Sequence, residues 1–111
     1  MTLTARAAAA GLPTTLDMGG IPWTLTYHRS LRDEDGRAIW GDCDHGTHRI
    51  RVAWSKDFDV TATRLLHEIF HASMPDGTFP ADGVDLERVV ELLEARTYGP
   101  LRDMGWLKGG T

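Results

Sequence analysis

Residues 65–72 of the 111-residue chain read Leu-Leu-His-Glu-Ile-Phe-His-Ala, within a segment whose apolar residues recur at helical spacing. On a helix His67 and His71 lie one turn apart on the same face, so both imidazoles can reach one ion at about 2.0–2.1 Å. Glu68 is rotated about 100° from His67, away from the ligands but toward a water molecule on the ion. The spacing therefore predicts a Zn²⁺ site with His67 and His71 as ligands and Glu68 as the catalytic base.

The helix that carries this motif is expected to begin at a cap formed by Asp59 or Thr61 and to end before Pro75. The residues predicted for its buried face follow i, i+4, i+7 and i+8 spacing, namely Ala62, Leu66, Ile69, Phe70 and Ser73. The two histidines flank this face, as expected for side chains that line a cleft. The alternative is that they are ordinary histidines on a helix surface.

A catalytic zinc ion usually takes three protein ligands and leaves one position for water, so another segment must supply the third. A second helix is expected from Asp85 to about Asp103, and three glutamates flank its apolar face. Glu87 is the preferred ligand because it lies near the core edge and the start of that helix. Glu91 is the main alternative and Glu94 a weaker one. At least two of these three glutamates are expected to lie on a solvated helix face without binding metal. The apolar residues expected to face inward are Leu86, Val89, Val90, Leu93 and Leu101.

Upstream of the motif, the sequence alternates with the period of a β-strand. Trp23, Leu25 and Tyr27 alternate with polar residues, a short strand is expected at residues 37–41, and a third at residues 49–54. Together these segments predict an α+β fold, in which a small antiparallel sheet of about three strands packs on two helices.

Length and composition limit the classes of function. A chain of this size forms one domain, expected at residues 21–106, with an N-terminal arm at residues 1–20 and a flexible tail at 107–111. A net charge of −4 gives no basic face, so no nucleic-acid partner is expected, and no apolar run is long enough to predict a membrane span. The single cysteine, Cys43, excludes an internal disulfide and favours a cytoplasmic location.

Other candidate groups have plainer interpretations. Asp42 to His45, with His48 nearby, could form a second metal site, but the flanking glycines favour a solvated turn. Tyr98 could reach the cleft as an oxyanion donor, although a packed tyrosine is the more common case. The four tryptophans are expected to pack in the core or at its edge: Trp23, Trp40, Trp54 and Trp106.

The motif at residues 65–72, with a strand before it at 50–52 and a helix after it at 86–91, resembles the minimal zincin-fold metallopeptidases encoded by bacteriophages and mobile elements. The resemblance covers about residues 21–104. It implies a zincin-like fold, zinc ligation by His67, His71 and Glu87 in the gluzincin manner, and catalysis by Glu68. If the chain is phage-encoded, its location would be the host cytoplasm. The long loop at residues 75–83 departs from the family pattern and leaves Glu91 open as the third ligand.

The expected function is therefore zinc-dependent hydrolysis of peptide bonds in a peptide or protein substrate. The alternative is a non-catalytic interaction or regulatory domain that keeps the zincin scaffold, because a chain this small has little apparatus for binding a substrate.

Overall fold

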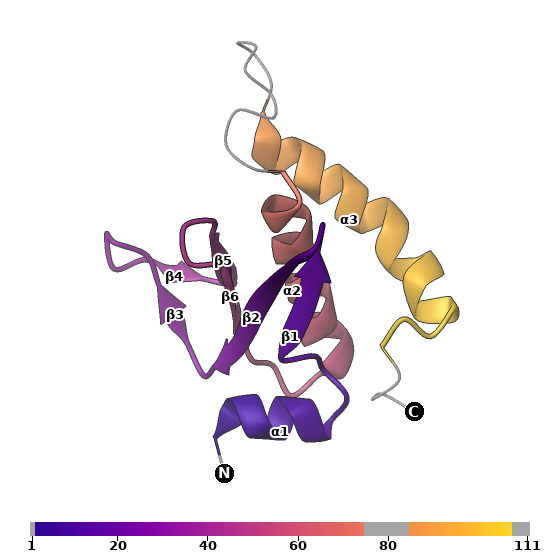
Figure 1. Ribbon diagram of the computed structural model, residues 1–111, viewed down its shortest axis with the longest axis horizontal. Coiled ribbons are helices and arrows are strands. Elements are labelled where there is room, and N and C mark those ends of the chain that lie inside the picture. Colours follow the sequence, from indigo (N-terminus) through magenta and orange to yellow (C-terminus); the bar gives the residue numbers. More distant parts are fainter. Residues whose placement is uncertain (1, 75–84, 108–111) are drawn as a thin grey trace.

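The computed structural model describes residues 2–74 and 85–107, which form an α+β fold (Figure 1). Within these residues lie three helices, a mixed four-stranded sheet and a two-stranded sheet, so the predicted α+β class is confirmed. None of the described helices has the length and apolar character needed to cross a membrane. In chain order the elements are α1 (Leu3–Ala9), β1 (Thr15–Met18), β2 (Ile21–His28), β3 (Leu31–Arg32), β4 (Ala38–Ile39), β5 (Gly41–Asp44), β6 (Arg49–Ala53), α2 (Phe58–Ala72) and α3 (Leu86–Asp103).

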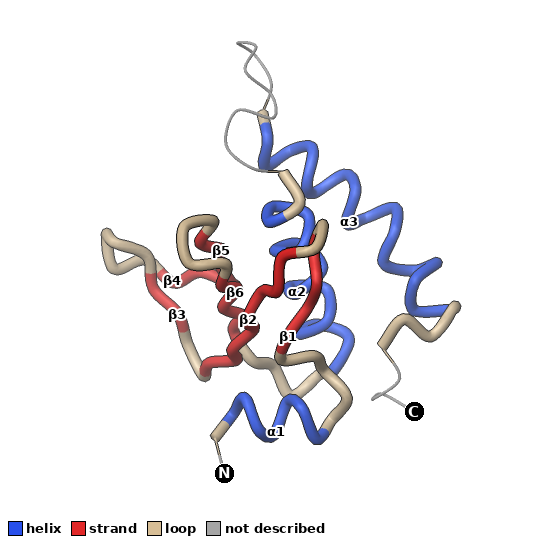
Figure 2. Tube along the Cα trace, in the orientation of Figure 1, coloured by secondary structure: helices blue, strands red, loops and turns tan. Residues whose placement is uncertain are grey.

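The larger sheet has the strand order β1-β2-β6-β5, and its central pair is parallel (Figure 2). The predicted antiparallel sheet of about three strands is therefore wrong in both strand count and direction. Two parallel neighbours need a long crossover connection, and the chain uses residues 29–48 for it. The strand expected at residues 37–41 is divided at Trp40, so that β4 pairs with β3 while β5 forms an edge of the larger sheet.

The first twenty residues, expected to form an arm, contribute a helix and a strand to the domain. Strand β1 pairs antiparallel with β2, and the two strands are joined by a turn at Gly19 and Gly20. The φ angles of these residues, 64° and 86°, are readily adopted by glycine. Ala7 of α1 and Leu12 are buried in the common core. Leu107, the first residue of the expected tail, packs against that core, and residues 108–111 lie outside the described part of the chain.

The core lies between the larger sheet and α2. Leu25, Ile50 and Val52 of the sheet and Leu65 of α2 are at most 1% exposed. Complete burial of side chains of this size contributes roughly 1.5–3 kcal/mol each, so this contact holds α2 firmly against the sheet. The connection from β6 is fixed by Thr61, whose hydroxyl donates to the carbonyl of Ser55 and accepts from its amide.

The buried face of α2 differs from the predicted one. It is formed by Thr61, Ala62, Leu65, Leu66, Glu68 and Ala72. Ile69 and Phe70 are only half-buried and Ser73 is exposed, because the face is centred near Leu65 instead of Leu66. In α3 only Val90 is fully buried, and the expectation that Leu93 faces inward is wrong because its side chain is 38% exposed.

Candidate metal centre

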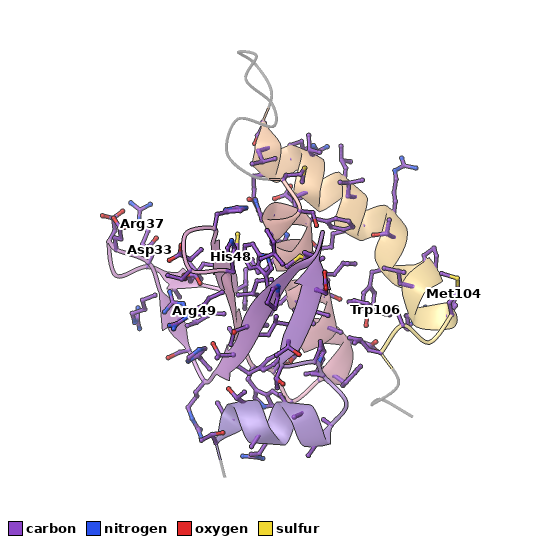
Figure 3. All side chains as sticks on the ribbon, viewed as in Figure 1. Asp33, Arg37, His48, Arg49, Met104 and Trp106 are labelled. Atoms are coloured by element: carbon purple, nitrogen blue, oxygen red, sulfur yellow. The ribbon has the colours of Figure 1, made fainter. Side chains whose placement is uncertain are left out.

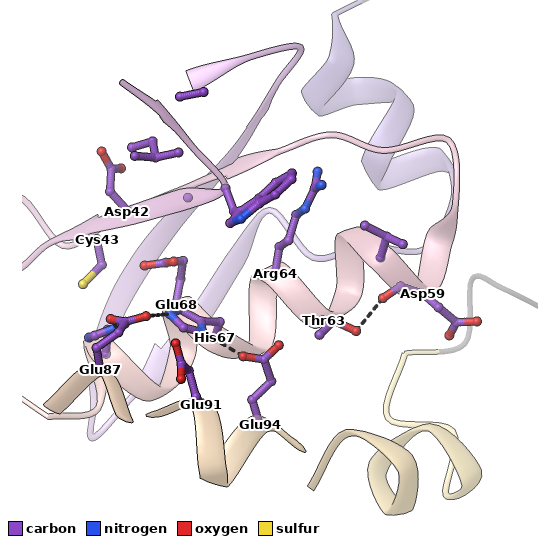
Figure 4. Close-up of a pocket in the computed structure, with 16 residues that line it drawn as sticks. Asp42, Cys43, Asp59, Thr63, Arg64, His67, Glu68, Glu87, Glu91 and Glu94 are labelled. Carbon is purple, nitrogen blue, oxygen red and sulfur yellow. Dashed lines mark hydrogen bonds and ion pairs between the residues drawn. The ribbon is translucent and has the colours of Figure 1, made fainter. Parts of the chain in front are cut away.

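A second row of side chains on α2, beside the buried face, lines an open cavity of about 930 Å³ (Figure 4). Residues from β5 form the opposite wall, and α3 closes a third side with Glu87, Glu91 and Glu94. We refer to this cavity as the cleft. His67, Glu68 and His71 all line it, so the structure gathers the three residues of the predicted motif around one solvent-accessible space.

The side chain of Glu87 lies between the two imidazoles of the motif. Its Oε1 is 2.7 Å from His67 Nε2 and its Oε2 is 2.8 Å from His71 Nε2. One ligand atom from each of these residues lies within 4.8 Å of the others, and no further group of this kind occurs in residues 2–74 and 85–107. Tetrahedral bonds of about 2.0–2.1 Å separate ligand atoms by about 3.3 Å, and the ligand atoms of this group lie within 4.8 Å of one another. The three residues therefore fit a metal ion.

The three glutamates of α3 occupy different positions. Glu87 belongs to the ligand group, whereas Glu91 lines the cleft and pairs with Arg88 at 4.0 Å. Glu94 lies on the other side of the first imidazole, with its Oε2 2.7 Å from His67 Nδ1. A carboxylate in that position fixes the orientation and tautomer of a metal-binding imidazole, which leaves Nε2 for the ion.

The sequence offers Glu94 only as a weaker candidate ligand and does not predict this supporting role. The available signal was the spacing of Glu94 from Glu87, which is seven residues, or two helical turns.

In the metal-free protein, partial burial opposes protonation of His67. The hydrogen bond to Glu94 and the negative charge of Glu87 outweigh that effect and raise the His67 pKa.

The carboxylate of Glu68 is buried between α2 and the edge strand β5, with 6% of the residue exposed. Burial raises its pKa to about 7, and the neighbouring His67 acts in the opposite direction. A group with a pKa near neutrality can both accept and return a proton at physiological pH, as a general base requires.

Gly41 of β5 makes room for this buried carboxylate. A Cβ atom at that position would lie 3.0 Å from Glu68 Cγ and 2.7 Å from the carbonyl oxygen of Arg51. Any side chain at position 41 would therefore displace Glu68 or the neighbouring strand. The sequence alone does not point to this glycine, because its role depends on how β5 and α2 pack.

The second candidate metal cluster, Asp42 to His45 with His48, has the contacts expected of a turn. The side chain of Asp44 accepts hydrogen bonds from the amides of Gly46 and Thr47, and these bonds lower its pKa. His45 and His48 lie against the ring of Trp23, with ring centroids 5.5 and 5.2 Å apart. Figure 3 labels His48 at this turn. Both imidazoles thus have packing roles at this turn.

The remaining aromatic candidates fall into two groups. Tyr98 does not line the cleft; its hydroxyl donates to Asp59 and so joins α3 to the start of α2. Trp23 is buried, and Trp54 and Trp106 pack at the core edge, as expected. The expectation for Trp40 is wrong, because its side chain is 68% exposed at the cleft.

Comparison with protein-family models, curated proteins and solved structures finds no significant match for this chain. Its function is therefore inferred from the site itself. The site combines three convergent nitrogen and oxygen donors, a buried carboxylate of near-neutral pKa and the edge of a β-sheet around one open cleft.

Proposed function

We propose that the protein is a zinc-dependent peptidase with a zincin-like active site. His67, His71 and Glu87 hold the ion, and Glu68 is the catalytic base. The observation that carries this proposal is the convergence of two imidazole Nε2 atoms and one carboxylate in an open cleft. Two histidines and a glutamate are a ligand set found in catalytic zinc sites, where the fourth position takes water or substrate.

The chemistry follows from the positions of these groups. When bound, a zinc ion in such a site polarises the scissile carbonyl and lowers the pKa of a water molecule toward about 7. Glu68 accepts a proton as the water oxygen bonds to the carbonyl carbon, and it returns that proton to the amine nitrogen as the carbon–nitrogen bond breaks. Glu94 keeps His67 oriented throughout, through the hydrogen bond at Nδ1.

The edge strand β5 supports a peptide as the substrate. In the larger sheet β5 pairs with β6 on one side only, and Gly41, Asp42 and Cys43 line the cleft. An extended peptide can add to such an edge through main-chain hydrogen bonds, which require no particular side chain. This addition would place the peptide backbone beside Glu68, which packs directly against Gly41.

The alternative is a non-catalytic interaction domain. It draws support from the apolar side chains that α3 presents to solvent, since Leu92 is 45% exposed and Leu93 is 38% exposed. Exposed apolar residues of this kind can mark a protein-binding surface. The two functions differ in what they require of Glu68, because a binding domain needs no catalytic base.

The deciding experiment compares the wild type with Glu68→Gln. Each protein is stripped with a chelator, reloaded with zinc and incubated with a peptide library whose cleavage is followed by mass spectrometry. We expect about one equivalent of zinc on both proteins and cleavage only by the wild type. Failure to take up zinc, or equal cleavage by both proteins, would overturn the proposal. Zinc uptake by both without cleavage by either would support the interaction domain.

A further inference from the structure

The cleft continues past the metal centre toward the beginning of α2. Val60, Arg64 and Glu68 line it at intervals of four residues, so they lie in one row along the helix. At a rise of about 1.5 Å per residue, Arg64 lies roughly 6 Å from Glu68 along the helix axis. Figure 4 shows Arg64 on the side of Glu68 that is opposite Glu87.

Arg64 is the only lysine or arginine among the described residues that line the cleft. Its guanidinium carbon lies 3.9 Å from the ring centroid of Trp40, and its Nη1 donates a 3.0 Å hydrogen bond to the carbonyl of Ala53. These contacts hold the guanidinium in place but use few of its five N–H donors. The exposed position of Trp40 is thus accounted for, because its ring supports the arginine.

Arg64 lacks a countercharge within the described part of the chain, where no ion pair involves it. Two carboxylates of the cleft have partners of their own, since Asp42 pairs with Arg51 and Asp59 accepts a hydrogen bond from Tyr98. Burial lowers the pKa of Arg64, as expected for a cation that is partly desolvated. A ligand carboxylate would supply the missing partner.

The direction of β5 places this arginine relative to a bound peptide. Antiparallel pairs are about two to three times as common as parallel ones, and β5 runs from Gly41, beside Trp40, toward Asp44. A peptide added antiparallel to β5 therefore runs with its C-terminus toward Trp40 and Arg64. An extended chain rises about 3.3 Å per residue, so roughly two residues separate the scissile bond from Arg64.

We propose that Arg64, held by Trp40, binds a carboxylate of the substrate about two residues beyond the scissile bond on its C-terminal side. The carboxylate is either the C-terminus of the substrate or an acidic side chain. A guanidinium can bind either group through two parallel hydrogen bonds. This inference rests on the peptidase function proposed above and makes Arg64 a determinant of specificity.

The test uses acetylated random hexapeptide libraries in matched pairs. One pair carries a free C-terminal acid or a C-terminal amide; the other is amidated and carries glutamate or glutamine at a fixed position. Cleavage is measured with the zinc-loaded wild type, and retention is measured on zinc-loaded Glu68→Gln protein. We expect one charged library to be preferred about tenfold over its uncharged partner, and the preferred pair identifies the source of the carboxylate.

Arg64→Gln should abolish this preference. Arg88→Gln is the matched control, since it removes the same charge from α3 outside the cleft and should preserve the preference. If Arg64→Gln does not fold, Arg64→Lys keeps the charge without the planar fork and should reduce the preference. Equal cleavage of charged and uncharged libraries by the wild type, or a charge preference that survives Arg64→Gln, would overturn the inference.

The retention measurement separates this inference from the peptidase proposal. If no library is cleaved but the Glu68→Gln protein still retains a charged library, adding Arg64→Gln to that protein should abolish the retention. This result would overturn the peptidase function and leave the carboxylate site standing. Cleavage without any charge preference would support the peptidase function and overturn the carboxylate site.

Discussion

Replacing Glu68 by glutamine should make the metal-free protein more stable at pH 8. Burial raises the pKa of this carboxyl from 4.5 to about 7, so the folded protein binds a proton there more tightly than the unfolded chain. The wild type is therefore most stable below pH 4.5 with respect to this group, and it loses that stability as the pH rises to about 7. Glutamine is nearly isosteric and cannot ionise, so the variant avoids the loss.

The size of the effect follows from the two pKa values. At about 1.4 kcal/mol per pH unit, the difference amounts to about 3 kcal/mol above pH 7, as an upper estimate. For a domain of this size, such a gain corresponds to a rise in Tm on the order of 10 °C. At pH 4 both carboxyl and amide are neutral, and the difference between the two proteins should nearly vanish.

Urea unfolding of both proteins at pH 4 and pH 8, in the presence of a chelator, measures this effect. With zinc bound the gain at pH 8 should shrink, because a nearby cation stabilises the ionised carboxylate and lowers its pKa. A Glu68→Gln protein that is less stable than the wild type at pH 8, or that gains the same stability at both pH values, would refute this prediction.

Three further variants test the site. Glu87→Ala should weaken zinc affinity, measured by competition with a chromophoric chelator, far more than Glu91→Ala, because only Glu87 lies between the two imidazoles; equal losses would contradict this assignment. Glu94→Gln should retain one equivalent of zinc but bind it about 10 to 100-fold more weakly, and unchanged affinity would exclude a role in orienting the ligand. Gly41→Ala should cost about 1–3 kcal/mol in urea unfolding because its Cβ meets a backbone oxygen at 2.7 Å. The control Gly99→Ala has open space within α3 and should stabilise the protein by up to about 1 kcal/mol, so the opposite order would show that the close contact is tolerated.

The sequence predicted the local elements better than their arrangement. Alternation at Trp23, Leu25 and Tyr27 predicted a strand where β2 lies, and helical spacing predicted both α2 and α3. Alternation shows which face of a strand is buried but not which strand lies beside it. The parallel pairing of Leu25 with Ile50 therefore could not be read from the pattern.

The error in the face of α2 has a specific physical cause. A pattern of apolar residues excludes a carboxylate from the buried face, so the expected face was centred on Leu66 and included Ile69 and Phe70. The structure buries Glu68 instead, beneath Gly41. Predictions from local sequence patterns often fail where a polar group is buried for function. Here the prediction of the buried face fails at Glu68, the proposed catalytic base.

The sequence alone could not choose among the glutamates of α3, because Glu87, Glu91 and Glu94 all flank its apolar face. The choice depends on the register of α3 against α2, which long-range packing determines. In the structure that register places Glu87 between the imidazoles and Glu94 behind one of them.

The shallow burial of α3 has a consequence for cooperativity. Within residues 85–107 only Val90 is fully buried, and ion pairs of Glu87 and Glu94 add to the apolar contacts that join α3 to the rest of the domain. Segments with few buried contacts open at lower free energy than the rest of a protein. An ion bound by Glu87 would oppose this opening, by about 4 kcal/mol at a thousandfold excess over its Kd. The amides of α3 would then exchange with solvent at a rate set by the concentration of free metal.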